Sequence, residues 1–222
     1  MANDYIKLYD FYNFDTLNIF CDASITGKYG NQTGCYGVVA VYLDNIVDEC
    51  YKLVSHTTSN QSELKGLRAA ISMANKYKNT YKNINIFCDS QVSILGLRDY
   101  IYNWRYNAKD NKLYNTSRVP VANQEIFLEC FYMLQDLQFT NLHFYHQAGH
   151  IDNTLDKLLR ASEVFRRSNN IKCNIDLNII RFISTYNTYV DMNSRSLLRR
   201  SDINKNYIDP IEFECRGPID KN

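Results

Sequence analysis

The chain has 222 residues, of which 45% are hydrophobic and 22% are charged, and its formal net charge is +1. That length and apolar content are enough to bury a sizeable core, so the composition excludes an intrinsically disordered chain. The near-zero net charge excludes a strong overall attraction to polyanions, and any such binding must come from local patches. Residues 1–14 contain no long apolar run, so we expect neither a signal peptide nor a membrane span.

The chain contains seven cysteines, an odd number without a CxxC pair. Two of them, Cys21 and Cys88, fall inside apolar segments typical of strands. This pattern favours reduced structural thiols over disulfides or a zinc site, and it therefore predicts a cytoplasmic protein.

The string NIFCD occurs twice, at residues 18–22 and 85–89. The side chains before each aspartate alternate with the period of a strand, so each copy predicts a buried strand that ends in a carboxylate, Asp22 or Asp89. If the two strands are parallel neighbours, both aspartates lie at the carboxyl edge of the sheet, and such close carboxylates favour cations between them. The alternative is ordinary turn chemistry, in which aspartate follows a strand by chance.

Two more acids belong to the elements that follow these strands. Residues 57–77 have helical apolar spacing after a capping Ser/Thr/Asn-rich start, which places Glu63 in the first turn of a helix. Further on, a short apolar strand leads into a loop with His146 and His150. A helix is then predicted to open near Asp156, with Leu155, Leu158 and Leu159 on its buried side.

This ordered set resembles the type 1 ribonuclease H family over residues 15–167. The resemblance rests on several short strings, namely FCDAS at 20–24, CYGVV at 35–39, TSNQSEL at 58–64, CDSQ at 88–91, IYNW at 101–104 and HQAGH at 146–150. No single string is specific, and the order of the set carries the resemblance. It implies an α/β fold with a five-stranded mixed sheet, three antiparallel strands followed by two parallel ones, and helices on both faces.

The resemblance also implies a catalytic site. Asp22 would bridge two metal ions, Glu63 and Asp89 would share one, Asp156 would hold the other, and His146 would relay protons, with His150 as its rival. Hydrolysis of a phosphodiester by two hard cations fits carboxylate ligands, which favours Mg²⁺, with Mn²⁺ as the alternative. The sequence departs from the family at Ala23, where glycine is common, and at Asp152 and Asn153, where the family usually has Asn-Glu.

Two regions are predicted to contact a nucleic acid. Short polar side chains near the acids suit a minor groove with 2′-hydroxyls, and they are Ser24, Thr58, Asn60 and Gln91. Residues 97–119 interleave basic and aromatic side chains, and the predicted contacts there are Trp104, Arg105, Lys109 and Lys112. The alternative for this segment is a solvated connector whose aromatic side chains pack inward.

Residues 1–14 are predicted to be a lead-in, residues 15–167 the catalytic domain and residues 168–222 an extension. The extension has a helical apolar pattern at Ile179, Ile183, Tyr186 and Val190, followed by basic residues at 195–200. Three roles are open for it: docking to a replication protein, contact with substrate, or packing on the core. We expect a monomer.

The resemblance predicts an endoribonuclease that cuts the RNA strand of RNA/DNA hybrids by two-metal-ion catalysis and leaves 5′-phosphate and 3′-hydroxyl ends. One alternative is another nuclease of the same fold, such as a resolvase-like DNA endonuclease. The other is a catalytically silent nucleic-acid-binding replication protein. The retention of four acids argues against the silent protein, because clustered carboxylates without metal are costly.

Overall fold

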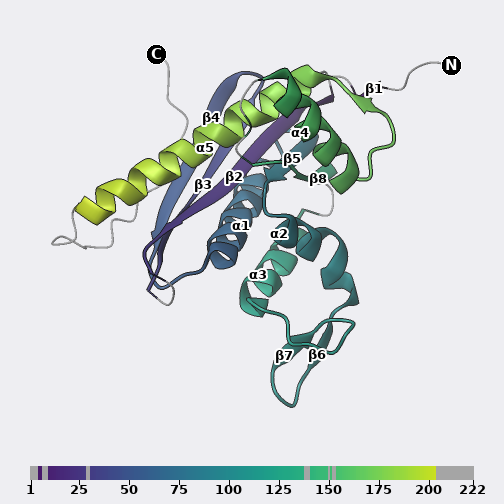
Figure 1. Cartoon of the computed structure of the whole chain (residues 1–222). Coiled ribbons are helices and arrows are strands. Elements are labelled where there is room, and N and C mark those ends of the chain that lie inside the picture. The colour runs from purple at the N-terminus through teal and green to yellow at the C-terminus, as the bar shows by residue number, and fades with distance from the viewer. Residues whose placement is uncertain are drawn as a thin grey trace.

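The computed structural model describes residues 5–6, 10–28, 31–137, 141–149, 151 and 154–203. Its centre is a five-stranded sheet with the order β4-β3-β2-β5-β8 (Figure 1). The strands are β2 (Thr16–Thr26), β3 (Thr33–Tyr42), β4 (Asn45–Val54), β5 (Asn83–Cys88) and β8 (Asn141–His146). Strands β2, β3 and β4 are antiparallel, whereas β5 and β8 run parallel to β2. The predicted sheet is therefore confirmed.

The two copies of the repeated string lie side by side in register. Strand β5 pairs with β2 so that Asn18 faces Asn85 and Cys21 faces Cys88. Both buried asparagine side chains have hydrogen-bond partners. Asn85 Nδ2 donates to Asn18 Oδ1 at 2.9 Å, and Asn18 Nδ2 donates to the Phe11 carbonyl at 2.6 Å. This register brings Asp22 and Asp89, the last residues of the two strings, close together. Asp89 directly follows β5 as predicted, but the prediction that the first strand ends at Asp22 is wrong, because β2 continues to Thr26 through its pairing with β3.

Helices cover both faces of the sheet, as Figure 1 shows. On one face lie α1 (Ser59–Tyr77) and α3 (Gln124–Gln135), and on the other lie α4 (Leu155–Ser168) and α5 (Leu177–Ile203). Between β5 and α3 come α2 (Gln91–Leu95), the π-helical turn η2 (Gly96–Tyr100) and the 3₁₀ turn η3 (Ile101–Asn103). None of the helices in the described part of the chain is long and apolar enough to cross a membrane.

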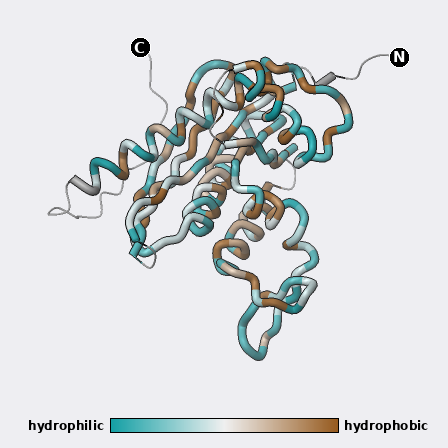
Figure 2. Tube along the Cα trace, in the orientation of Figure 1, coloured by the Kyte–Doolittle hydropathy of each residue, from teal (hydrophilic) through white to brown (hydrophobic). Residues whose placement is uncertain are grey.

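The core has two layers because successive strand residues point to opposite faces. Leu17, Ile19 and Cys21 pack toward α1, whereas Phe20 packs toward α4 and α5. Phe20 stacks on Phe87 with ring centroids 4.8 Å apart. Figure 2 shows hydrophobic residues along the central strands and α3. Both faces of these strands are therefore buried, which accounts for the near-continuous apolar strings in the sequence.

The extension shares this core. Ile179, Ile183 and Val190 of α5 belong to the same buried cluster as Phe20, and the ring of Tyr186 stacks on Phe20 at 5.3 Å. The short strand β9 (Asn174–Ile175) pairs in parallel with β1 (Tyr5–Ile6), which joins the extension to the lead-in. Residues 177–203 thus form part of the folded unit, whatever further role they have.

The basic segment folds into a small hairpin, β6 (Arg105–Asn107) and β7 (Lys112–Tyr114), which projects from the sheet beyond α3 (Figure 1). Two local predictions are wrong. Leu155 and Leu159 are 60% and 51% exposed, because the buried stripe of α4 follows Leu158, Ala161 and Phe165. Glu63 lies in the second turn of α1, because the helix begins at Ser59 after its Thr58 cap.

Candidate active site

A pocket of about 450 Å³ opens at the end of β5, beside the second half of β2. Three carboxylates from three elements line it: Asp22 from β2, Glu63 from α1 and Asp89 directly after β5. The in-register pairing of β2 with β5 brings Asp22 and Asp89 together, and α1 packs across these strands with Glu63 facing the same space. The structure thus collects three of the four predicted acids at one edge of the sheet.

The pocket disfavours negative charge on these acids. Burial, followed by the charges of Asp89 and Asp191, raises the pKa of Asp22 to about 8, while the Ala23 backbone and Arg195 oppose the shift. Burial also raises the pKa of Glu63, followed by the charges of Cys88, Asp89 and Asp22. A positive charge placed among these carboxylates would therefore be stabilised strongly.

The donor set fits a hard divalent cation. Asp22 Oδ2 and Glu63 Oε2 are buried and have no hydrogen-bond partner, although the Ala23 N–H donates to Asp22 Oδ1 at 2.6 Å. One ligand atom each of Glu63, Cys88 and Asp89 lies within 4.8 Å of the others. Contact with Cys21 and burial raise the pKa of Cys88 and keep its thiol neutral. Carboxylate oxygens are thus the available ligands, as Mg²⁺ prefers.

His146 lies close to this site, but not on a loop. The expected loop position is wrong, because His146 is the last residue of β8 and is only 8% exposed. Its Nε2 is 3.1 Å from the Asp89 carbonyl oxygen. Burial lowers the pKa of the imidazole, which keeps His146 neutral near pH 7.

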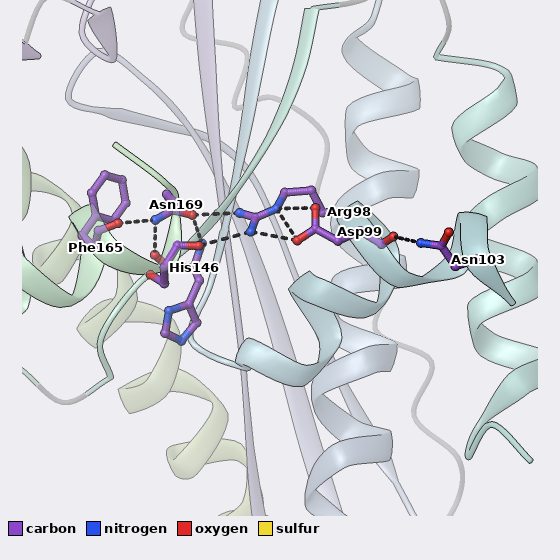
Figure 3. A network of polar contacts seen from close by, with 7 residues as sticks. Arg98, Asp99, Asn103, His146, Phe165 and Asn169 are labelled. Atoms are coloured by element: carbon purple, nitrogen blue, oxygen red, sulfur yellow. Dashed lines mark hydrogen bonds and ion pairs between the residues drawn. The ribbon is translucent and has the colours of Figure 1, made fainter. Parts of the chain in front are cut away.

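Figure 3 shows how the backbone of His146 is held. The His146 N–H donates to Asn169 Oδ1 at 2.9 Å, and Asn169 Nδ2 donates to the His146 carbonyl at 2.7 Å. Arg98 donates to the same Asn169 Oδ1 at 3.2 Å and to the Ser168 carbonyl at 3.1 Å. Asn169, the C-cap residue directly after α4, therefore links the end of β8 to η2.

The segment after His146 contacts Asp89. A Cβ added at Gly149 would lie 2.6 Å from Asp89 Oδ2, so the backbone of Gly149 packs directly on this carboxylate. His150, Asp152 and Asn153 lie outside the described residues, and the choice between His146 and His150 stays a prediction.

Asp156 is the one predicted acid that does not line the pocket. It lies exposed in the first turn of α4. Its role as a fourth ligand therefore stays a prediction.

Of the predicted substrate contacts, Ser24 lines the pocket and the others do not. Thr58 caps α1, since its Oγ1 accepts from the Gln61 N–H at 3.2 Å, and Ser24 Oγ donates to Asp191 Oδ1 at 3.2 Å. Trp104 packs edge-on against Phe127 at 4.9 Å, so the core holds this indole. The remaining predicted contacts are exposed, and they are Asn60 and Gln91 at helix starts and Arg105, Lys109 and Lys112 in the hairpin.

Sequence analysis missed one wall of the pocket. It is formed by α5, which contributes Asp191, Arg195, Leu198 and Arg199 to the lining. The basic run at 195–200 was visible in the sequence, but no pattern there indicated which edge of the sheet the helix reaches.

The sheet order and the acidic pocket define an RNase H-like protein. The family model for RNase H matches residues 15–162. A ribonuclease HI of Pasteurella multocida (strain Pm70) is 30% identical over 148 residues, which cover 65% of this chain and 88% of that protein. The chain therefore belongs to the RNase H family and is a ribonuclease H, a hydrolase of the nuclease class.

Solved structures support the fold. A foamy viral protease-reverse transcriptase in complex with RNA/DNA hybrid aligns with 13% identity and a TM-score of 0.51, covering 69% of this chain and 20% of that one. The same kind of protein in complex with dsDNA aligns with 16% identity and a TM-score of 0.50, covering 69% and 93%. At these identities the likeness establishes the architecture.

Proposed function

We propose that this protein hydrolyses the RNA strand of RNA/DNA hybrids and leaves 5′-phosphate and 3′-hydroxyl ends. The observation that supports this most is the pocket in which Asp22, Glu63 and Asp89 converge with two buried carboxylate oxygens that lack hydrogen-bond partners. Bound Mg²⁺ or Mn²⁺ would supply a nucleophilic water near neutral pH and stabilise charge on the phosphate. Family membership and the hybrid-bound relative agree with this substrate.

Each acid has a distinct place in this proposal. Asp22 is central because its charge acts on Glu63, the charge of Asp89 acts on it, and it is nearly inaccessible to solvent. Glu63 and Asp89 supply oxygens from the α1 side and the β5 side. Asp156 would complete the set from α4. His146, neutral and next to the Asp89 backbone, can take up or release a proton.

The protein would recognise the hybrid through contacts with both nucleic-acid strands. Asn60 and Gln91 are exposed at the starts of α1 and α2, and they can hydrogen-bond 2′-hydroxyls in a shallow minor groove. The hairpin cations would bind phosphates without reading bases. A monomer suffices for this arrangement. The described cysteines are free thiols, which is consistent with the predicted cytoplasmic location.

The test is cleavage of end-labelled RNA/DNA, RNA/RNA and DNA/DNA duplexes of one sequence, with Mg²⁺, with Mn²⁺ and with EDTA. We expect cleavage of the hybrid alone, in the RNA strand and only with metal, and RNA products that a 5′-phosphate-dependent exonuclease degrades. Cleavage of the DNA duplex would instead establish the resolvase-like alternative. Binding of the hybrid without cleavage under every metal condition would establish the silent binding protein.

A further inference from the structure

Helix α5 brings permanent positive charge to the edge of the acidic pocket. Arg195 and Arg199 are four residues apart, so they share one face of the helix, and both line the pocket with Asp22 and Asp89. An anionic ligand that approaches the three carboxylates would therefore meet these arginines at the pocket wall.

The Arg195 side chain is held by Asp191, which in turn accepts a hydrogen bond from Ser24. Its Nε donates to Asp191 Oδ1 at 2.7 Å, and Ser24 Oγ of β2 donates to the same oxygen at 3.2 Å. The Asp191 side chain is only 10% exposed, whereas that of Arg195 is 49% exposed. Asp191 thus ties the arginine to the strand that carries Asp22, and about half of the arginine side chain faces solvent.

These contacts argue against Asp191 as a further cation ligand. One oxygen of Asp191 already accepts hydrogen bonds from a guanidinium and a hydroxyl, whereas Asp22 Oδ2 and Glu63 Oε2 lack partners. Arg195 is the more exposed member of the pair, and it lines the pocket. A guanidinium binds phosphate oxygens through paired hydrogen bonds and remains charged at any working pH.

We propose that α5 forms a phosphate-binding wall of the active site, in which Arg195 and Arg199 contact the nucleic-acid backbone beside the bond that is cut. Asp191 is the positioning residue that orients Arg195. The inference rests on the proposed function for the identity of the substrate, a polynucleotide backbone. It gives the extension a direct part in substrate binding, in addition to its place in the core.

The test measures binding of a labelled RNA/DNA hybrid at several salt concentrations, with Ca²⁺ in place of Mg²⁺ to suppress cleavage. We expect Arg195→Ala and Arg199→Ala each to weaken binding about tenfold, and to lower the slope of log affinity against log salt by about one per lost phosphate contact. Arg195→Lys keeps the charge and should recover part of the affinity. Arg181→Ala, on the same helix but outside the pocket, is the matched control and should bind like wild type.

Asp191→Asn tests whether Asp191 orients Arg195 or only supports the fold. It keeps an oxygen for Ser24 and Arg195 but loses the charge, so we expect a higher KM for the hybrid with little change in kcat, while Arg199→Ala in the same background still lowers the salt slope. Thermal unfolding of every variant identifies any loss of binding that is due to misfolding. Arg199→Ala leaves the Asp191–Arg195 ion pair intact and serves as the variant least prone to this effect.

The outcomes distinguish the two proposals. If wild type cuts hybrid but both arginine variants keep wild-type affinity and salt slope, the phosphate-binding wall is overturned and the proposed function stands. If wild type does not cut hybrid but the arginine variants still weaken its binding, the proposed function fails and the wall stands. If wild type does not bind hybrid, both are overturned.

Discussion

At the scale of single residues, each active-site acid contributes both a negative charge and packing contacts, and substitution by the corresponding amide separates the two contributions. Asp89 directly follows β5. The backbone of Gly149 packs against its carboxylate, and its backbone carbonyl lies next to His146 Nε2. A substitution that removes the charge of this residue but keeps its size should weaken metal binding and leave these packing contacts in place. The same reasoning applies to Glu63, which is fixed by the rigid helix α1.

We expect Asp89→Asn to lower hybrid cleavage by at least about a thousandfold, because a metal ligand is lost, while hybrid affinity in Ca²⁺ changes less than about threefold. Single-turnover cleavage and equilibrium binding measure the two effects. Asp44→Asn is the control, since Asp44 is exposed in the β3–β4 turn and pairs with Tyr12. Activity of Asp89→Asn at ordinary Mg²⁺ would contradict the ligand assignment.

Glu63→Gln should stabilise the metal-free protein above neutral pH. Burial raises the pKa of Glu63 above its unfolded value of about 4.3, so its contribution to stability is present at low pH and is lost as the pH rises through the folded pKa. Glutamine cannot ionise. In EDTA, the Tm of the variant should therefore exceed that of wild type by at least about 3 °C at pH 8, where 1 kcal/mol corresponds to about 2–4 °C, and by less at pH 5.

Circular dichroism melts from pH 5 to pH 8 measure this difference, with Glu125→Gln as a control on the exposed start of α3. Added Mg²⁺ should raise the Tm of wild type more than that of Glu63→Gln, because the cation relieves the buried charge only where charge is present. Parallel pH curves for wild type and variant would show that Glu63 carries no electrostatic strain in the folded state.

At the scale of elements, short-range patterns predicted what they could physically encode. Alternation around Cys21 and Cys88 gave two strands, and the capping residues near Thr58 gave a helix start, because both signals are local. The exposed face of α4 was misassigned at Leu159, since a helix with leucines on several sides does not specify which side meets the sheet. Residues 105–114 lack a strong alternation of apolar and polar side chains, so the sequence did not indicate that they form a hairpin.

The hairpin makes a prediction about salt dependence. Replacing Arg105, Lys109 and Lys112 together with alanine should weaken hybrid binding and lower the salt slope by up to about three, one for each phosphate contact, with little change in turnover at saturating substrate. Lys78→Ala with Lys82→Ala is the control, since these lysines lie where α1 ends and β5 begins. An unchanged slope in the triple variant would make the hairpin a structural connector.

At the scale of the whole molecule, the family resemblance described the sheet but not the extension. The apolar spacing of Ile179, Ile183 and Val190 predicted a helix with one buried face, and a single helical face does not identify its partner. Only the fold shows that this face packs on Phe20 and that the following turns reach the Asp22 pocket. Tertiary contacts between distant segments, here residues 20 and 186, leave no local trace in the sequence.

If α5 is part of the core, replacing one large side chain on its buried face with a smaller one must destabilise the entire protein. Ile183 is 3% exposed and belongs to the cluster of Phe20, Val39 and Phe165, so Ile183→Ala should lower the free energy of unfolding by about 2–4 kcal/mol. Met192, on the same helix but 65% exposed, is the control, and Met192→Ala should change stability by less than about 0.5 kcal/mol. Denaturant unfolding followed by tryptophan fluorescence and by circular dichroism gives both values. Equal, small effects would mean that α5 detaches without cost, and the sheet would then fold without the wall that α5 gives to the active site.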